Sequence, residues 1–220
     1  MAPLKGGGAP AAARLPPHGQ VVRRGPTHRP AVAFTFDDGP DPRTTLQVAS
    51  TLEQAGARGT FFALAAKAAR CGWVVQELTA RGHEVALHGF SHRPLWTMGL
   101  HATIQQLRRA VETLEELTGR PVRYYRPPWG HVTAGALRAA EQLGLRVVLW
   151  TFAPWDWLPW LRQQTLRAQL RRALVPGGII DLHDAGTAGG RRVLLSALPH
   201  ALHEAHGLGL QAVTLSNLLG

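Results

Sequence analysis

The chain has 220 residues, enough for one domain with a full hydrophobic core, and its hydrophobic content of 45% is typical of a globular protein. The formal net charge is +10, which favours polyanionic partners. The arginines are scattered, however, aromatic residues do not alternate with them, and no recognition motif appears, so we expect no nucleic-acid binding. The single cysteine, Cys71, excludes an internal disulfide. No apolar run approaches the roughly 20 residues that span a bilayer, so we expect no membrane span.

The first 29 residues are rich in Gly, Pro, Ala and Arg and lack the apolar centre of a secretory signal. We expect a flexible leader over residues 1–29 and one domain over residues 30–220. This leader contains no export signal, so the sequence alone does not determine a location.

The first predicted strand, residues 31–36, is an unbroken apolar run of the kind that is buried on both faces of a parallel sheet. Asp37 and Asp38 follow it directly, at the strand end where α/β folds collect ligands. Neighbouring side chains on an extended segment point to opposite sides, so one carboxylate can hold a metal while the other acts as a base. The alternative is a plain turn, in which Asp, Gly and Pro are the usual residues.

Helical patterns and short apolar runs alternate along the rest of the chain. The further predicted strands cover residues 60–64, 84–87, 122–125, 146–151, 178–182 and 210–213. The predicted helices cover residues 42–54, 67–81, 97–117, 133–143, 161–174, 190–206 and 215–219. Seven strands that alternate with helices indicate parallel β/α units, hence an α/β fold in a single domain.

Most predicted strands end in polar side chains, and in a parallel barrel all of these ends face one side. His88 and His92 are four residues apart, a spacing that can place two imidazoles on one side of a turn to hold Zn²⁺. The alternative is a pair of ordinary surface or core histidines. A carboxylate from a neighbouring strand end would complete a three-ligand site with coordination positions left open.

Five polar segments also occur in a recognisable order, and each lies at or shortly after a predicted strand end. They are TFDDG (35–39), HGFSH (88–92), RPPWG (126–130), DW (156–157) and IIDLH (179–183). Together they resemble the motifs of the polysaccharide deacetylases, the NodB-homology domain of carbohydrate esterase family four, over residues 30–215. The resemblance implies a distorted (β/α)7 barrel and metal-dependent hydrolysis of an N-acetyl or O-acetyl group on a sugar.

Carried over residue by residue, the resemblance implies that Asp38, His88 and His92 hold the metal. The expected ion is Zn²⁺ or another divalent transition metal such as Co²⁺. Asp37 would be the base that takes a proton from the attacking water, and Arg126 would pair with it. The alternative for Arg126 is a salt bridge that only closes the barrel mouth.

The resemblance further implies that His183 is the acid that protonates the leaving amine and that Asp156 orients and charges its imidazole. The alternative for Asp156 is a helix cap. A carboxylate beside an imidazole favours the protonated form, as an acid catalyst requires. The implied substrate contacts are the backbone N–H of Tyr125 at the oxyanion and the side chains of Trp129, Trp157 and Leu182 along the sugar groove.

Three positions depart from the family pattern. Gly89 replaces the usual Ser or Thr, Ala153 replaces an Asp, and Trp129 replaces Tyr or Phe. None is an expected ligand or proton carrier, so we expect them to affect the substrate more than the reaction.

The favoured function is therefore a metal-dependent deacetylase of a GlcNAc-containing glycan, such as peptidoglycan or a chitin-like oligomer. One alternative is a glycan-binding module that has lost turnover, and another is a metal-dependent hydrolase of a different amide or ester. We expect an acetylated glycan as the partner and a monomeric protein. The resemblance implies action outside the cytoplasm or at the cell wall.

Overall fold

The computed structural model describes residues 21–158 and 160–220 of the chain, so most of the predicted leader lies outside the described residues. The last part of that leader is packed against the domain. Val22 forms a parallel bridge with Val148, and the Gly25 N–H donates to the carbonyl of Gly177 at 2.7 Å. Val22 and Gly25, which precede the expected boundary at residue 30, thus make backbone contacts with the domain.

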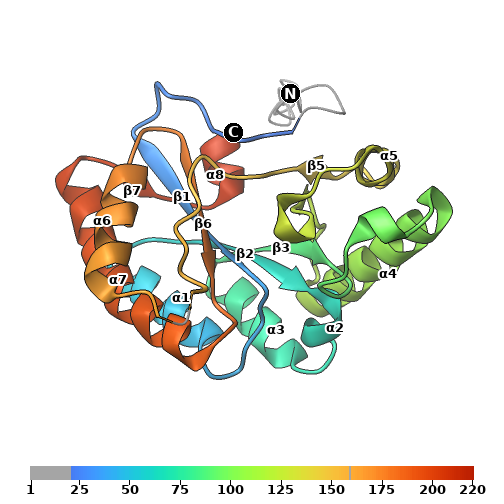
Figure 1. The fold of residues 1–220 in the computed structure, drawn as a ribbon, viewed down its shortest axis with the longest axis horizontal. Coiled ribbons are helices and arrows are strands. Elements are labelled where there is room, and N and C mark those ends of the chain that lie inside the picture. The colour runs from blue at the N-terminus through green and yellow to red at the C-terminus, as the bar shows by residue number, and fades with distance from the viewer. Residues whose placement is uncertain (1–20, 159) are drawn as a thin grey trace, which may run out of the picture.

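One curled parallel sheet of seven strands lies at the centre of the described part of the molecule (Figure 1). The strands are β1 (Ala31–Asp37), β2 (Thr60–Leu64), β3 (Glu84–Gly89), β4 (Tyr124–Tyr125), β5 (Arg146–Val147), β6 (Gly178–His183) and β7 (Gln211–Ala212). Their order is β5-β4-β3-β2-β1-β6, and β7 pairs with the start of β1. The predicted fold, a single-domain distorted (β/α)7 barrel, is confirmed.

The distortion lies between β5 and β6. The fourth and fifth strands are only two residues long, shorter than the predicted 122–125 and 146–151. After β5 the chain leaves regular pairing and reaches β6, where Phe152 forms an isolated bridge with Ile180. The barrel is therefore bridged at this point by an irregular segment, residues 148–152, instead of a ladder of strands.

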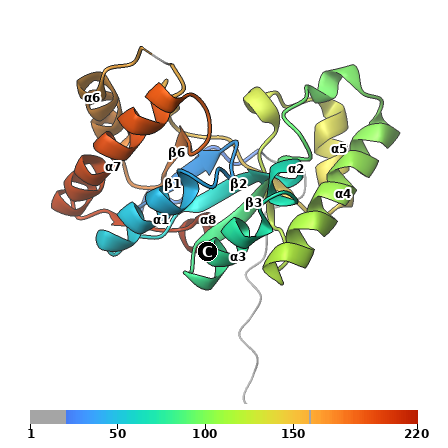
Figure 2. The ribbon, with the colours of Figure 1, turned by 90° about the horizontal axis from the view of Figure 1, so that it is seen from below.

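Helices cover the outer face of the sheet, with α1, α6 and α7 on one side and α4 and α5 on the other (Figure 2). They are α1 (Thr45–Gln54), α2 (Ala65–Ala68), α3 (Gly72–Ala80), α4 (Leu100–Thr118), α5 (Ala134–Gln142), α6 (Gln163–Ala173), α7 (Ala188–Gly207) and α8 (Leu215–Leu219), with short 3-10 turns η1 (Leu95–Thr97) and η2 (Pro128–Gly130). The helix predicted over residues 67–81 is divided into α2 and α3. None of the helices in the described part of the chain has the length and apolar character needed to cross a bilayer.

Alternate side chains along each strand point to opposite faces of the sheet, one toward the helices and the other toward the barrel interior. In β1, Val32, Phe34 and Phe36 pack among the helices, whereas Ala31 and Ala33 face the barrel interior. The same period of two continues to the end of the strand, so its next inward position after Ala33 is polar. The interior is thus apolar near the strand starts and polar near the strand ends.

Helix α8 closes the apolar end of the barrel. Leu215 and Leu218 belong to the interior core, and the Leu215 N–H donates to Thr60 Oγ1 at 2.9 Å at the start of β2. Glu84, at the start of β3, accepts from the Ser216 N–H at 3.2 Å. Helix α8 thus fills the apolar end of the barrel interior, and the polar end of the interior lies at the strand C-termini.

Candidate active site

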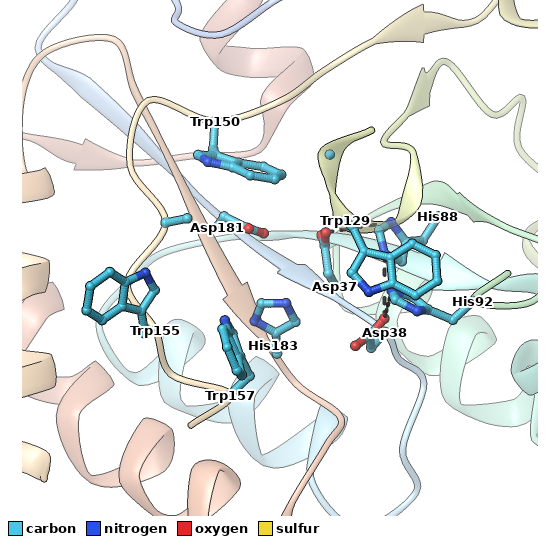
Figure 3. Close-up of a pocket in the computed structure, with 12 residues that line it drawn as sticks. Asp37, Asp38, His88, His92, Trp129, Trp150, Trp155, Trp157, Asp181 and His183 are labelled. Atoms are coloured by element: carbon cyan, nitrogen blue, oxygen red, sulfur yellow. Dashed lines mark ion pairs between the residues drawn. The ribbon is translucent and has the colours of Figure 1, made fainter. Parts of the chain in front are cut away.

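A cavity of about 510 Å³ opens at the carboxyl ends of the strands (Figure 3). The residues that line it come from distant parts of the chain, and most of them are polar or aromatic. They are Asp37, Asp38, His88, His92, Trp129, Gly130, Trp150, Ala153, Trp155, Trp157, Asp181 and His183. The structure therefore brings together the polar residues that follow β1, β3 and β6 in the sequence, as their placement at strand ends predicts.

Asp38, His88 and His92 form a compact cluster on one side of the cavity. One ligand atom from each lies within 4.8 Å of the others. Asp38 Oδ1 is 3.5 Å from His88 Nε2 and 3.3 Å from His92 Nε2. This oxygen is buried and has no hydrogen-bond partner among the described residues, and a buried acceptor of this kind calls for one. A carboxylate and two imidazoles are the donor set of many zinc sites, so the cluster fits a divalent transition metal.

The tautomer of His88 is set by its second ring nitrogen. Nδ1 lies 2.8 Å from the carbonyl oxygen of Arg126, which can only accept, so Nδ1 carries the hydrogen and Nε2 is free as a ligand atom. Burial, opposed by the charges of Asp37 and Asp38, lowers the pKa of His88. The imidazole is thus kept in the neutral form that metal binding requires.

The backbone presents Asp38 to the cluster. Its φ of 72° lies in the left-handed region, so the chain turns away from β1 between the two carboxylates. The Lys67 ammonium donates to the Asp38 carbonyl oxygen at 2.7 Å and holds this turn. Gly89 also has a left-handed φ, 108°, which explains why a glycine suits the position where the family usually has Ser or Thr.

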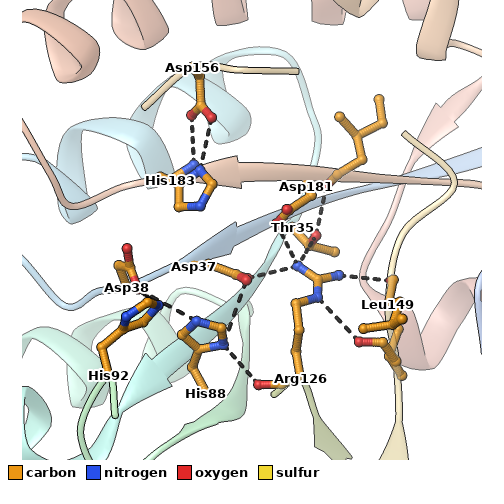
Figure 4. A network of polar contacts seen from close by, with 12 residues as sticks. Thr35, Asp37, Asp38, His88, His92, Arg126, Leu149, Asp156, Asp181 and His183 are labelled. Atoms are coloured by element: carbon orange, nitrogen blue, oxygen red, sulfur yellow. Dashed lines mark hydrogen bonds and ion pairs between the residues drawn. The ribbon is translucent and has the colours of Figure 1, made fainter. Parts of the chain in front are cut away.

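Arg126 is fully buried behind the cavity and holds the carboxylate of Asp37 in place (Figure 4). Nη1 donates to Asp37 Oδ1 at 2.7 Å and to Asp181 Oδ1 at 3.0 Å. The other guanidinium nitrogens donate to the carbonyl oxygens of Val148 at 3.2 Å and Leu149 at 3.1 Å. Asp37 is therefore fixed through one oxygen, while its other oxygen, Oδ2, lies 3.6 Å from the ring of His88.

Asp181 is a site residue to which the sequence analysis gave no role. It is buried, lines the cavity and shares the guanidinium of Arg126 with Asp37. Burial and the nearby charge of Asp37 raise the pKa of Asp181 well above its usual range. Its signal in the sequence is a lone carboxylate inside an apolar strand, two residues before His183 and so on the same face.

His183 and Asp156 form a hydrogen-bonded pair across the cavity from the cluster of Asp38, His88 and His92 (Figures 3 and 4). Asp156 Oδ1 lies 2.8 Å from His183 Nδ1, and Oδ2 accepts the His183 backbone N–H at 2.7 Å. Burial alone would lower the pKa of His183, but the hydrogen bond and charge of Asp156 raise it to about 10. The imidazole is thus protonated at neutral pH.

Tryptophans form the walls of the cavity. Trp129 lies beside His92 in the cluster with Asp38 and His88. Trp155 and Trp157 lie on the opposite side of the cavity, near His183 (Figure 3). All three are about half exposed. Gly130 follows Trp129 with a φ of 66°, and a Cβ there would lie 2.5 Å from Trp150, so only glycine allows this close contact.

One expected substrate contact, Leu182, is not brought to the cavity, and Tyr125 was expected there only through its backbone. The Tyr125 side chain is buried among the helix-facing residues of β4 and pairs with Leu87 and Val147 in the sheet, so the contact of its backbone N–H with the oxyanion stays a prediction. Leu182 is buried in the core among α1, α6 and α7. Each is one position out of step with the inward-facing Arg126 and His183, and on a strand a shift of one residue reverses the face.

Comparisons with known proteins agree with this geometry. The family model described as polysaccharide deacetylase matches residues 24–148. The chain is 30% identical over 207 residues to a peptidoglycan-N-acetylglucosamine deacetylase of Bacillus cereus, covering 93% of this chain and 95% of the relative. It is 31% identical over 194 residues to a chitooligosaccharide deacetylase of Azorhizobium caulinodans, covering 82% of this chain and 91% of the relative.

Solved structures give the same result for the fold. A peptidoglycan N-acetylglucosamine deacetylase aligns with a TM-score of 0.85 at 26% identity, covering 90% of this chain and 92% of that chain. BA3943 from Bacillus anthracis, described as a CE4 family pseudoenzyme, aligns with a TM-score of 0.84 at 19% identity, covering 92% of this chain and 69% of that chain. At 19% identity the second likeness concerns the fold alone.

Proposed function

The chain belongs to the polysaccharide deacetylase family and is a hydrolase of glycan amide bonds, and on that premise we propose that it removes N-acetyl groups from a GlcNAc-containing glycan, such as peptidoglycan or a chitin-like oligomer. The observation that carries this proposal is the grouping inside one cavity of a three-ligand cluster, a buried carboxylate and a carboxylate-bound imidazole. Amide hydrolysis needs an activated water, an oxyanion stabiliser and an acid for the leaving nitrogen.

Asp38, His88 and His92 would hold the ion, with Zn²⁺ as the expected metal and Co²⁺ as a substitute. When bound, such an ion polarises the acetyl carbonyl and lowers the pKa of water. The neutral state of His88, enforced by burial and by the Arg126 carbonyl, keeps one ligand ready without loss of a proton.

Asp37 acts as the general base. Arg126 occupies one oxygen of this carboxylate and fixes its orientation, so the second oxygen remains to accept a proton from the attacking water. Because both groups are almost fully buried, their ion pair is little screened by solvent.

His183 acts as the general acid. Asp156 engages Nδ1, and His183 lines the cavity, so Nε2 is the ring nitrogen left to donate to the leaving nitrogen. The charge of Asp156 stabilises the imidazolium before the reaction. Base and acid are thus held by different partners, Asp37 by Arg126 and His183 by Asp156.

We place the action of this enzyme outside the cytoplasm, at an anionic cell wall, and expect it to work as a monomer. Two observations support the location. Relatives are named as deacetylases of peptidoglycan, and the net charge of +10 suits an anionic wall polymer.

The test is to incubate the metal-loaded protein with a panel of acetylated glycans and to measure free acetate. We expect release that stops after chelation, returns with Zn²⁺ or Co²⁺, and is lost in Asp37→Asn. Unchanged release in Asp37→Asn would show that the base is misassigned. Glycan binding without acetate release would instead favour the binding-module alternative, and competition by O-acetyl esters measures the preference between acyl linkages.

A further inference from the structure

A row of aromatic rings leads out of the cavity on the side of the metal cluster. Trp129 stacks edge-on against His92, with ring centroids 4.1 Å apart. Trp96 lies 5.8 Å from Trp129, and His131 lies 4.6 Å from Trp96. His92 and Trp129 line the cavity, whereas Trp96 and His131 do not. We name the outer three, Trp96, Trp129 and His131, the Trp96 shelf.

The two indoles of the shelf are about half exposed to solvent. Trp96 is 53% exposed and Trp129 is 48% exposed, although indoles are usually well buried. The next residue inward, Leu95, is only 6% exposed and packs in the core beneath α4 and α5. The short turn η1 thus fixes the backbone of Trp96 through Leu95 and leaves the indole itself on the surface.

The indoles of the shelf are held in place before any ligand arrives. Trp96 contacts a ring on either side, and Trp129 is fixed between His92 and Trp96. Groups that are ordered in advance lose little entropy on binding. Exposed, pre-ordered aromatic rings are typical of binding surfaces, whereas a ring that only fills space is covered by its neighbours.

We propose that the Trp96 shelf binds a pyranose ring of the glycan next to the residue that enters the cavity, so that the preferred substrate is an oligomer and not a single acetylated sugar. This inference rests on the proposed function, because it requires a glycan in the cavity. The C–H face of a pyranose is apolar and flat and matches an indole face. The ring centroids of Trp96 and Trp129 are 5.8 Å apart and their planes are inclined by 53°, so a sugar on Trp96 would lie next to the sugar at Trp129 and tilted from it.

The test compares Trp96→Ala and Trp96→Phe with wild type on N-acetylglucosamine oligomers from the monomer to the hexamer. We expect Trp96→Ala to raise KM by about tenfold for oligomers long enough to reach the shelf and by much less for the shortest accepted substrate. Trp96→Phe, which keeps a ring beside Trp129, should largely restore the wild-type KM. The matched control is Trp73→Ala, because Trp73 is an equally exposed indole, 55%, on α3 and does not line the cavity.

A binding measurement separates this inference from the proposed function. Titration of Asp37→Asn, with and without Trp96→Ala, by the same oligomers should show a Kd penalty that appears only above a threshold length. If Trp96→Ala weakens short and long oligomers equally, or weakens none, the shelf is not a sugar site. If oligomer binding shows the threshold but wild type releases no acetate from any glycan, the shelf stands and the deacetylase proposal falls.

Discussion

Replacing Asp156 with asparagine removes the negative charge beside His183 and keeps the shape of the side chain. In the wild type both oxygens are engaged, at 2.8 Å from the ring nitrogen and 2.7 Å from the backbone nitrogen of His183. A hydrogen bond to a charged group contributes about 1.5–3 kcal/mol. Loss of that energy lowers the pKa of His183, which is about 10 in the native protein, by about 1–2.

The sign of the pH effect follows from the role of an acid. His183 is active while protonated, and its activity is lost as pH rises through its pKa, so Asp156→Asn loses activity at lower pH than wild type. Because His183 stays protonated at neutral pH even after this fall, we expect kcat near pH 7 to change little and the alkaline limit of activity to move down by about 1–2 pH units. The assay is acetate release from an N-acetylated glycan oligomer between pH 6 and 11.

An aryl acetate is the matched substrate, because its phenolate leaves without being protonated. We expect Asp156→Asn to leave aryl acetate hydrolysis close to wild type, which also reports that the variant is folded and retains its metal. Equal losses on the amide and the aryl ester, or an alkaline limb that does not move, would refute the acid role of His183 and reduce Asp156 to a structural residue.

Three further predictions concern stability. Arg126→Met leaves two buried carboxylates without their cation and should lower the free energy of unfolding by about 3–5 kcal/mol in urea denaturation; an unchanged midpoint would contradict the buried network. Burial raises the pKa of Asp184 to about 7, so its stabilisation is present at low pH and is lost as pH rises through that value; Asp184→Asn should flatten this dependence when unfolding is measured between pH 5 and 8 with chelator present. Gly130→Ala should be less stable than Gly144→Ala in thermal melts, because both have left-handed φ but only the first places a Cβ against Trp150; equal melting temperatures would refute the clash.

Much of the fold could be predicted from the sequence because local and tertiary preferences agree. The apolar runs that became β1, β2 and β6 are bounded by turn residues, and the observed ends differ from the predicted ones by one residue at most. The first helix was expected from residue 42, and Asp41 does accept the Arg43 N–H at 2.8 Å as a capping residue does, but regular α-helix begins at Thr45.

Other elements were set by contacts that no local pattern reports. The run at 146–151 reads as one strand, yet only Arg146 and Val147 pair as β5, because the chain must cross to β6. The helical pattern over residues 67–81 is interrupted at residues 69–71, between α2 and α3. Gly72, the first residue of α3, packs so closely on Leu117 of α4 that a Cβ there would lie 2.6 Å from that side chain. Tertiary packing overrides propensity at both places.

In the candidate site, too, some features could be predicted from the sequence and others depend on tertiary contacts. Segment order placed Asp38, His88 and His183 correctly at one end of the barrel, because parallel strands share that end. The face on which a strand residue points depends on a register that the sequence does not state. This is why Leu182 was expected in the cavity wall and Asp181 was given no role there.

The irregular stretch between β5 and β6 has a consequence for how such an enzyme can diversify. Val148 and Leu149 hold Arg126 through carbonyl oxygens alone, an interaction that any amino acid supplies from its main chain. A few residues later the same stretch carries Trp155 and Trp157 into the cavity wall. The half-exposed side chains of Trp155 and Trp157 can thus be replaced to change the choice of glycan, while the guanidinium that holds Asp37 keeps its main-chain contacts.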